Sequence, residues 1–536
     1  MASISKWRKD EDFDRSFRQI GGLTALSRLL GFLRDICLAQ FIGAGAVADA
    51  FLVAFKLPNL FRRLTADGAM TNAFLPVFAH VRETQGRAQA LILATEVQVT
   101  LFLALSVIVL IAEIFMPFVI GFLAPGFMDQ PDLFQSAVSL ARVTMPYLPM
   151  ISLVALWAAV TNAHNRFFGG AAAPVILNIF LIGGILTSAT MGQIGFFNEA
   201  HSSILSLALP ICVALLMAGA SQMLLMQRML AKIDASLTWH RPRLSENSKR
   251  MWRAFVPAAL GAGGLQLNLL IDMILASLVS VGAISWLYYA DRIVQLPLGI
   301  IGIALGTALL PTLSKLESEQ QMDEVANRIG HSLQIALFFA LPATLALFVI
   351  SGDLISGLFG YGAFSQTDSQ QAAYALMAYA VGLTAFVVNK VFQPVFFASS
   401  RGTFVLKISL LSVAINIVGS VTMMPILGHI GLALATAISS WVAVVIMAVI
   451  LLREKRLLMA SLRQSLPIFL ASVIMMIALG ATKWLMSPLW HGALLAPLIM
   501  TVIYVFVGLA VYFGISYGLG TIPPFLFGKR RLSRKA

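Results

Sequence analysis

Long apolar runs follow one another along almost the whole of this 536-residue chain. A helix needs about 20 mostly apolar residues to cross a bilayer. Charged residues make up only 11 % of the chain, whereas a soluble globule carries about 25 %. The sequence therefore predicts an all-α polytopic membrane protein with 14 transmembrane helices. The predicted spans are 20–43, 47–66, 92–122, 134–162, 170–192, 202–227, 252–279, 284–312, 331–351, 370–398, 403–424, 430–452, 465–486 and 493–519.

The basic residues predict how the chain is oriented. A net charge of +13 would suit nucleic-acid binding if the charges lay on one soluble surface. Instead, 30 of the 37 Lys and Arg fall in segments on one predicted side of the membrane. Basic loops stay on the cytoplasmic side. Both termini are therefore predicted to be cytoplasmic, and no nucleic-acid partner is expected.

The longest basic loop divides the chain into six spans, six spans and a final pair. An even number of helices in each half would make the halves parallel repeats, related by an axis along the membrane normal. The predicted parts are a cytoplasmic N-terminal arm (1–19), an N-lobe (20–228), a cytoplasmic inter-lobe loop (229–251), a C-lobe (252–452), two C-terminal helices (453–519) and a basic cytoplasmic tail (520–536).

Several charged residues lie inside the predicted spans, where each costs about 2.5–3.5 kcal/mol at the bilayer centre. Arg28 and Asp35 share a face of the first span, and Asp49 and Lys56 share a face of the second. Arg28 lies about 12 Å inside the end of its span at 1.5 Å per residue. The full set at membrane depth is Arg28, Arg34, Asp35, Asp49, Lys56, Asp272, Asp291, Arg292 and Lys390.

Two explanations fit these charges. Internal ion pairs, such as Arg34–Asp35 or Asp49–Lys56, would hold helices together. However, five cations stand against four carboxylates in this set, and Arg62 and Arg63 at the predicted inner mouth add two more cations. A cavity between the two halves, lined by arginines that bind phosphate oxygens bidentately, accounts for the excess. We prefer this second interpretation.

The sequence contains no motif for ATP hydrolysis or metal chemistry. It has no GxxxxGKS/T loop, no HExxH and no Cys/His cluster, so neither a metal site nor a cofactor is expected. We therefore predict a transporter and not an enzyme, driven by an ion gradient or the membrane potential. Asp272, in LGAGGLQLNLLID, could hold Na⁺ or a proton together with Asn416. A role in helix packing is the alternative for both residues.

Three segments resemble the MurJ/MviN lipid II flippase family: SRLLGFLRD, GAGAVADAFLVAFKLPNLFRRLTADGAMTNAFLPVF and WLYYADRIVQLPLGIIGIALGTALLPTLSK. The resemblance extends over the chain in helix number and order. It implies the fold of the multidrug/oligosaccharidyl-lipid/polysaccharide (MOP) exporters. In that fold, two six-helix lobes form a V around a central cationic cavity, and two C-terminal helices form a groove for a polyprenyl tail.

The resemblance also implies a function in cell-wall biogenesis and cell shape. The substrate would be lipid II, the undecaprenyl-diphosphate-linked peptidoglycan precursor, moved by alternating access from the cytoplasmic to the periplasmic leaflet of the bacterial inner membrane. Bilayer lipids and proteins of peptidoglycan synthesis would be the other partners. Substrate-binding residues implied by position, together with two further cations, are Arg28, Arg34, Arg62, Arg292, Lys56 and Lys390. The gate or structural charges are Asp35, Asp49, Asp67 and Asp291.

The chain departs from the family pattern at three places. Gln295 stands where relatives often have an acidic residue, ASSRGTF lacks the usual DT-x-TP pattern, and Ser420 occupies an expected sodium-ligand position. Ion coupling is therefore left open. The alternatives are an exporter of another polyprenyl-diphosphate oligosaccharide, of the O-antigen type, or of a drug. A membrane-embedded glycosyl- or phosphotransferase is a further alternative, although DFD at 12–14 lies in the N-terminal arm, before the first span.

Overall fold

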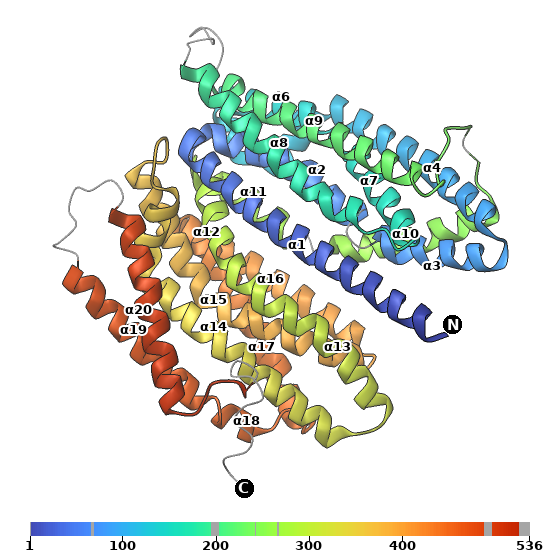
Figure 1. Ribbon diagram of the computed structural model, residues 1–536. Helices are drawn as coiled ribbons and strands as arrows, with labels where there is room; N and C mark the ends of the chain where they lie inside the picture. The colour runs from blue at the N-terminus through green and yellow to red at the C-terminus, as the bar shows by residue number, and fades with distance from the viewer. Residues whose placement is uncertain are drawn as a thin grey trace. The chain divides into compact units, whose positions relative to one another are not determined.

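The computed structural model describes residues 2–65, 69–193, 203–241, 243–264, 267–486 and 496–524, and Asp67 lies outside these ranges. Regular structure in them is entirely helical (Figure 1). The chain forms two compact units, Met1–Gly282 and Ala283–Ala536. This division is based on packing. The lobe boundaries that were predicted from charge are a separate statement, and they stay a prediction.

The first unit holds eleven α-helices and one short 3-10 helix among its described residues. These are α1 (Ala2–Ile42), α2 (Ala46–Thr65), α3 (Ala69–Thr84), α4 (Arg87–Ile114), α5 (Met116–Leu123), η1 (Pro125–Asp129), α6 (Pro131–Thr144), α7 (Tyr147–Asn162), α8 (Phe168–Gln193), α9 (Ser203–Ala231), α10 (Glu246–Gly264) and α11 (Leu267–Val279).

The second unit holds nine α-helices and one π-helical turn among its described residues. These are α12 (Ala283–Pro297), η2 (Leu298–Gly302), α13 (Ile303–Ser318), α14 (Met322–Phe359), α15 (Gln366–Ala398), α16 (Gly402–Leu427), α17 (His429–Arg453), α18 (Met459–Arg463), α19 (Leu466–Met486) and α20 (Ala496–Gly518).

Ten helical stretches in the described ranges are long and apolar enough to cross a membrane, which confirms the all-α polytopic class. The other four predicted spans coincide with α1, α2, the α10–α11 pair and the α12–η2–α13 run. Charges inside α1 and α2 lower their hydropathy, and the π-helical turn η2 lies between α12 and α13. Fourteen spans are consistent with this arrangement.

Proline explains two breaks inside predicted spans. The stretch 92–122 is divided at Phe115, because α4 ends at Ile114 and α5 begins at Met116 with Pro117 in its first turn. The stretch 134–162 is divided into α6 and α7 beside Pro146. A proline has no amide hydrogen to donate to the preceding turn, so the helix kinks or restarts there.

Helix α2 lies in the core of the first unit although it carries charge. It packs on α6 and α9, and α1 packs on α8. Ala48, Ala50, Val53 and Ala54 of α2 are fully buried. Small side chains let neighbouring helices approach closely without help from hydrophobic association in lipid. The carboxylate of Asp49, which is also fully buried, therefore faces protein and not acyl chains.

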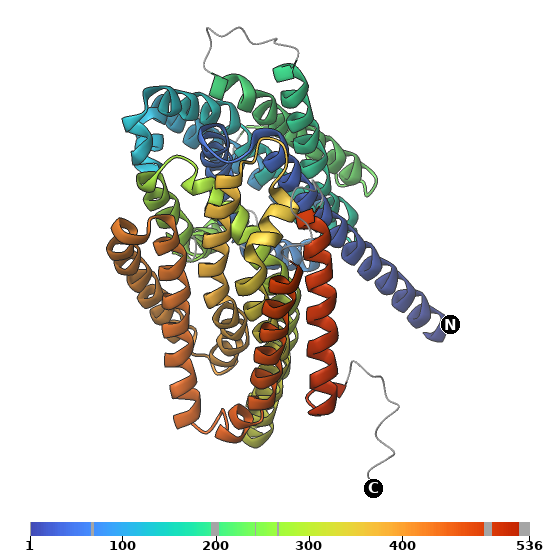
Figure 2. The ribbon, with the colours of Figure 1, turned by 90° about the vertical axis from the view of Figure 1, so that its left-hand side faces the viewer.

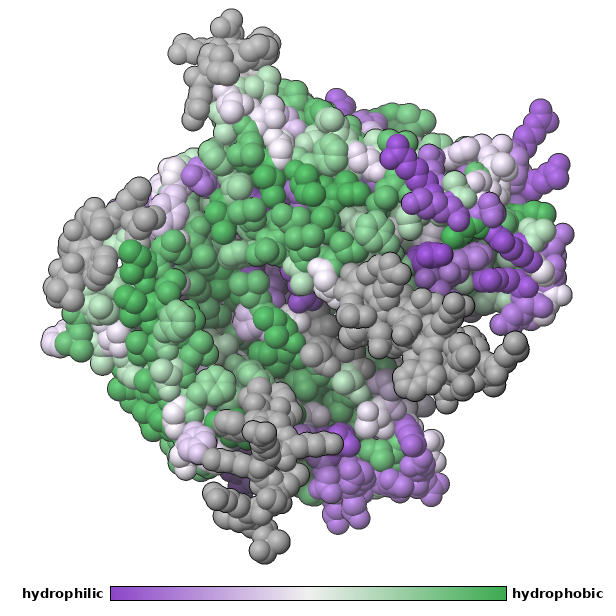
Figure 3. Space-filling model, viewed as in Figure 1, coloured by the Kyte–Doolittle hydropathy of each residue, from purple (hydrophilic) through white to green (hydrophobic). Residues whose placement is uncertain are grey.

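The two C-terminal helices pack on α14 of the second unit. Figures 1 and 2 show α19 and α20, in red tones, running side by side next to α14. Tyr512 donates a hydrogen bond to the carbonyl of Phe338 at 2.6 Å. The Lys483 ammonium lies 2.7 Å from the Asp353 carboxylate. The surface in Figure 3 is broadly apolar. Exposed side chains of α20 include the apolar Phe506.

Close packing between α14 and α20 gives a first prediction. A Cβ at Gly357 would lie 2.8 Å from the carbonyl oxygen of Pro497, whereas a Cβ at Gly352 of the same helix would meet nothing within 4 Å. Gly357→Ala is expected to destabilise the protein by about 1–3 kcal/mol because the backbone must shift. Gly352→Ala is the matched control, and it should be neutral or gain up to about 1 kcal/mol from helix propensity. Thermal unfolding in detergent measures both, and equal melting temperatures for the two variants would contradict this packing.

Candidate functional site

Arg34 and Asp35 form a buried ion pair on α1. The Arg34 Nη2 lies 2.7 Å from the Asp35 Oδ1, and their side chains are 9 and 1 % exposed. Arg34 Nη1 donates to Asn178 Oδ1 of α8 at 3.0 Å. Asn178 in turn donates to the backbone oxygen of Ser27 at 3.0 Å. The ion pair that the sequence offered as an alternative is therefore present, and it ties α1 to α8.

Arg28 lies two turns before this pair on the same helix, and its side chain is exposed. Gly31, between the two arginines, lies against Asn178, because a Cβ there would come within 3.5 Å of the amide nitrogen. The structure thus places the two predicted arginines of α1 in contrasting surroundings. The exposed guanidinium of Arg28 is accessible to a ligand. The three guanidinium nitrogens of Arg34 already donate hydrogen bonds to Asp35 and Asn178.

Asp49 lies in the first turn of α2 and is fully buried. Its Oδ2 accepts a hydrogen bond from the backbone nitrogen of Gly282 at 2.6 Å. A carboxylate near a helix N-terminus is also stabilised by the helix dipole. Lys56 and Arg62 follow on the same helix, and both are partly buried. The Arg62 Nε donates to Asn59 Oδ1 at 3.2 Å, so this guanidinium is held close to the α2 backbone.

The predicted charges of the second unit begin on α12. Arg292 donates to the hydroxyl of Tyr288 at 3.1 Å, and its guanidinium carbon lies 4.8 Å from the centre of the Tyr288 ring. Stacking on an aromatic face orients a guanidinium and leaves its edge free to donate hydrogen bonds. Gln295 donates to the carboxylate of Asp291 one turn away. A glutamine at position 295 can donate this hydrogen bond to Asp291, whereas an ionised carboxylate there has no hydrogen to donate.

Lys390 lies on α15, the helix that packs against the π-helical turn η2. Its side chain is exposed, and a Cβ at Gly302 of η2 would come within 3.2 Å of Lys390 Cγ. The turn follows directly on Pro297, and π-helical turns are frequent at functional sites. In the part of the chain that the structure describes, the buried Oδ1 of the neighbouring Asn389 has no hydrogen-bond partner. Polar groups and an irregular turn thus meet around Lys390.

The two residues of the candidate ion site belong to different units. Asp272 lies partly buried on α11 of the first unit. Asn416 lies fully buried on α16 of the second, where it accepts from Ser420 at 2.9 Å and donates to Thr436 of α17 at 3.2 Å. This network holds α16 on α17, in keeping with the packing alternative. Their joint use as an ion site stays a prediction.

Two contact residues, Asn178 and Tyr288, were missed from the sequence. Asn178 is an isolated polar residue within an apolar run, and that isolation was a usable signal. Tyr288 carried no such signal, since aromatic residues are common near membrane interfaces. Among the predicted site residues, Arg34 and Asp35 are in contact with each other. Arg292 contacts Tyr288, which was not predicted. Asp67 lies outside the described residues.

Solved structures identify the fold. A structure titled "Lipid II flippase MurJ, inward closed conformation" matches with a TM-score of 0.77, at 23 % identity over 93 % of this chain and 98 % of the other. An inward-facing multidrug resistance MATE transporter of the MOP superfamily matches with a TM-score of 0.60, at 14 % identity over 85 % of this chain and 96 % of the other. The fold of this chain is therefore the fold that these two solved structures share.

Sequence comparison is more specific. The family model described as lipid II flippase MurJ matches residues 38–506. A Rhizobium meliloti (strain 1021) protein named "Probable lipid II flippase MurJ" is 37 % identical over 511 residues, 94 % of each chain. A Burkholderia cenocepacia protein named "Lipid II flippase MurJ" is 32 % identical over 430 residues, 80 % of this chain and 81 % of that protein. The chain belongs to the lipid II flippase MurJ family.

Proposed function

We propose that this protein translocates lipid II from the cytoplasmic to the periplasmic leaflet of the bacterial inner membrane. The observation that carries the proposal is the family match, which covers nearly all of this chain and of its relatives. The proposal accounts for guanidinium groups on apolar helices, because the substrate headgroup carries a diphosphate. Arginine suits such a group, since its planar fork binds two phosphate oxygens together.

In this proposal the cations that contact the headgroup are Arg28, Arg62, Arg292, Lys56 and Lys390. Arg28 and Lys390 are exposed, and the other three are partly buried. Arg34 joins them when its pair with Asp35 opens. Asp49, Asp67 and Asp291 act as gate or structural charges. Each cation offsets phosphate charge as the headgroup leaves water, because a bare diphosphate in a low-dielectric interior would be far more costly.

The energy source is proposed on electrostatic grounds. Moving one charge across 100 mV is worth about 2.3 kcal/mol. An inside-negative potential therefore favours outward movement of an anionic headgroup. Coupling to Na⁺ or H⁺ through Asp272 and Asn416 is the second proposed source. Transport would proceed by alternating access, in which one group of helices rocks against another around the binding site.

The membrane arrangement completes the proposal. Both termini are placed in the cytoplasm, because the basic segments then lie inside. The polyprenyl tail stays in the bilayer along α19 and α20, whose outer side chains are apolar and exposed, as at Ile477 and Phe506. Only the headgroup then needs a polar path, and the protein supplies binding and movement without breaking a bond.

Reconstitution tests this function directly. The purified protein in vesicles should move labelled lipid II between leaflets, and an inside-negative potential should speed outward movement. A polyprenyl diphosphate carrying an O-antigen-type glycan, offered in the same vesicles, should move far more slowly. The gene should also restore growth to a bacterium depleted of its lipid II flippase. Failure of both assays, with the other lipid moved instead, would assign the chain to another polyprenyl-diphosphate substrate.

A further inference from the structure

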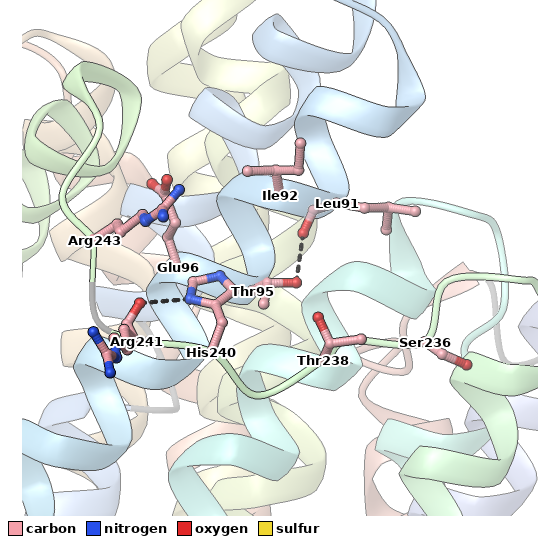
Figure 4. A pocket seen from close by; sticks show the side chains of 9 residues that line it. All are labelled: Leu91, Ile92, Thr95, Glu96, Ser236, Thr238, His240, Arg241 and Arg243. Atoms are coloured by element: carbon pink, nitrogen blue, oxygen red, sulfur yellow. Dashed lines mark hydrogen bonds between the residues drawn. The ribbon is translucent and has the colours of Figure 1, made fainter.

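A cavity of about 550 Å³ lies between the start of α4 and the segment that joins α9 to α10 (Figure 4). This volume falls within the range of about 300–1,000 Å³ that is typical of small-molecule sites. Helix α4 contributes Ile92 and Glu96, and the joining segment contributes His240, Arg241 and Arg243. The cavity lies wholly within the first unit, and its residues are not among the predicted substrate-binding residues.

The carboxylate of Glu96 is the unusual group in this cavity. Its side chain is only 5 % exposed, and its Oε2 accepts from the backbone nitrogen of Ser245 at 3.3 Å and from the Ser245 hydroxyl. Among the side chains that the structure describes, none forms an ion pair with Glu96. A buried carboxylate without a cation is costly. The site therefore favours a ligand that brings a positive charge.

The other polar groups of the cavity favour a negative charge. Arg241 and Arg243 are both exposed, and both line the cavity. His240 is oriented through its Nδ1, which lies 2.6 Å from the backbone oxygen of Arg241. Arginine side chains bind phosphate oxygens with charge-assisted hydrogen bonds. Glu96 would repel a simple anion. The negative Glu96 and the positive Arg241 and Arg243 together therefore favour a zwitterion, which carries both charges.

The surroundings of the cavity place it at a membrane surface. Farther along α4, side chains such as Val107 and Leu110 are exposed and apolar, as on a lipid-facing helix. Trp239, next to the cavity, is 52 % exposed and packs edge-on against Phe102 of α4 at 5.1 Å. Tryptophan is enriched where a membrane meets water. Ile92 is also exposed at the cavity, so an acyl chain could leave along α4.

We propose that this cavity binds the headgroup of a zwitterionic phospholipid with a primary ammonium, of which phosphatidylethanolamine is the simplest. The phosphate lies at Arg241 and Arg243, and the ammonium lies at Glu96. The lipid comes from the bilayer leaflet that meets the start of α4, and its chains run along the exposed face of that helix. The site is separate from the charges proposed to carry lipid II, and it does not depend on that function.

Lipid titration with the full-length protein tests the site. Native mass spectrometry in detergent would compare phosphatidylethanolamine with phosphatidylcholine, whose trimethylated ammonium donates no hydrogen bond, and with phosphatidylglycerol, which has no cation. We expect phosphatidylethanolamine to bind about tenfold more tightly than either, as expected for one charge-assisted hydrogen bond. Glu96→Gln should abolish this preference while still accepting from Ser245. Arg241→Ala with Arg243→Ala should weaken all three lipids.

Two nearby substitutions serve as matched controls. Glu246→Gln and Arg250→Ala remove charges of each sign from exposed positions close by that do not line the cavity, and neither should change lipid binding. Equal affinity of the Glu96→Gln variant and the parent for phosphatidylethanolamine would overturn the proposal, as would a preference of the parent for phosphatidylglycerol. Displacement of the lipid by an equal concentration of soluble glycerophosphoethanolamine would overturn its assignment to a membrane lipid.

Discussion

Replacement of Arg292 by alanine is expected to abolish complementation of a lipid II flippase-depleted bacterium while leaving the protein folded in the membrane. Arg292 is partly buried, and its guanidinium is held over the Tyr288 ring and by the Tyr288 hydroxyl. Loss of a charged hydrogen-bonding contact to phosphate costs about 1.5–3 kcal/mol, or about 10- to 150-fold in affinity. Both contacts with Tyr288 lie within α12 and join no other helix, so their loss should change stability little.

Variants of the same side chain separate charge from geometry. Arg292→Lys keeps the charge but loses the planar fork, and it should transport at an intermediate rate. Tyr288→Phe keeps the ring and removes only the hydroxyl, so it should retain most of the activity. Arg328→Ala removes an exposed cation of α14 and is the matched control. Lipid II transport in vesicles and the amount of folded protein are the two measurements. Full transport by Arg292→Ala would remove this residue from the binding site.

The fold was largely accessible from the sequence because lipid imposes a length and an apolar composition on every spanning helix. Ten spans satisfy both conditions in the structure. The spans at α1 and α2 depart from the apolar rule, and two of their charged residues, Asp35 and Asp49, are buried in protein. The breaks beside Pro117 and Pro146 were not predicted, since proline occurs both inside and between membrane helices and only packing decides the outcome.

The site was less accessible, because periodicity places side chains on a face of one helix without naming their partners. Arg34 and Arg28 are similar in sequence terms, yet one is buried against Asn178 and the other is exposed. That difference depends on α8, which lies 144 residues away. Charge counting favoured a cationic cavity that includes Arg34 and left its ion pair with Asp35 as the alternative. In the structure Arg34 also holds α1 on α8 through Asn178. Ligand binding and helix packing are thus two possible roles of Arg34, and they make different predictions.

Arg34→Ala is expected to be among the most destabilising single substitutions in the first unit. It leaves the carboxylate of Asp35, which is 1 % exposed, without its ion-pair partner. Breaking a buried pair by removing one member costs about 3–5 kcal/mol, whereas replacing both members by apolar groups is often neutral. The variant Arg34→Met with Asp35→Ala should therefore recover most of the lost stability. A double-mutant cycle, measured by unfolding in detergent, gives the coupling between the two residues.

The double variant also decides what Arg34 does during transport. If the guanidinium binds the diphosphate once its pair with Asp35 opens, a folded double variant should still fail to move lipid II. If Arg34 only holds α1 on α8, the double variant should recover both stability and transport. We expect the first result, because a guanidinium binds phosphate oxygens through the same planar fork that now holds the carboxylate. Wild-type transport by the stable double variant would confine Arg34 to holding α1 on α8.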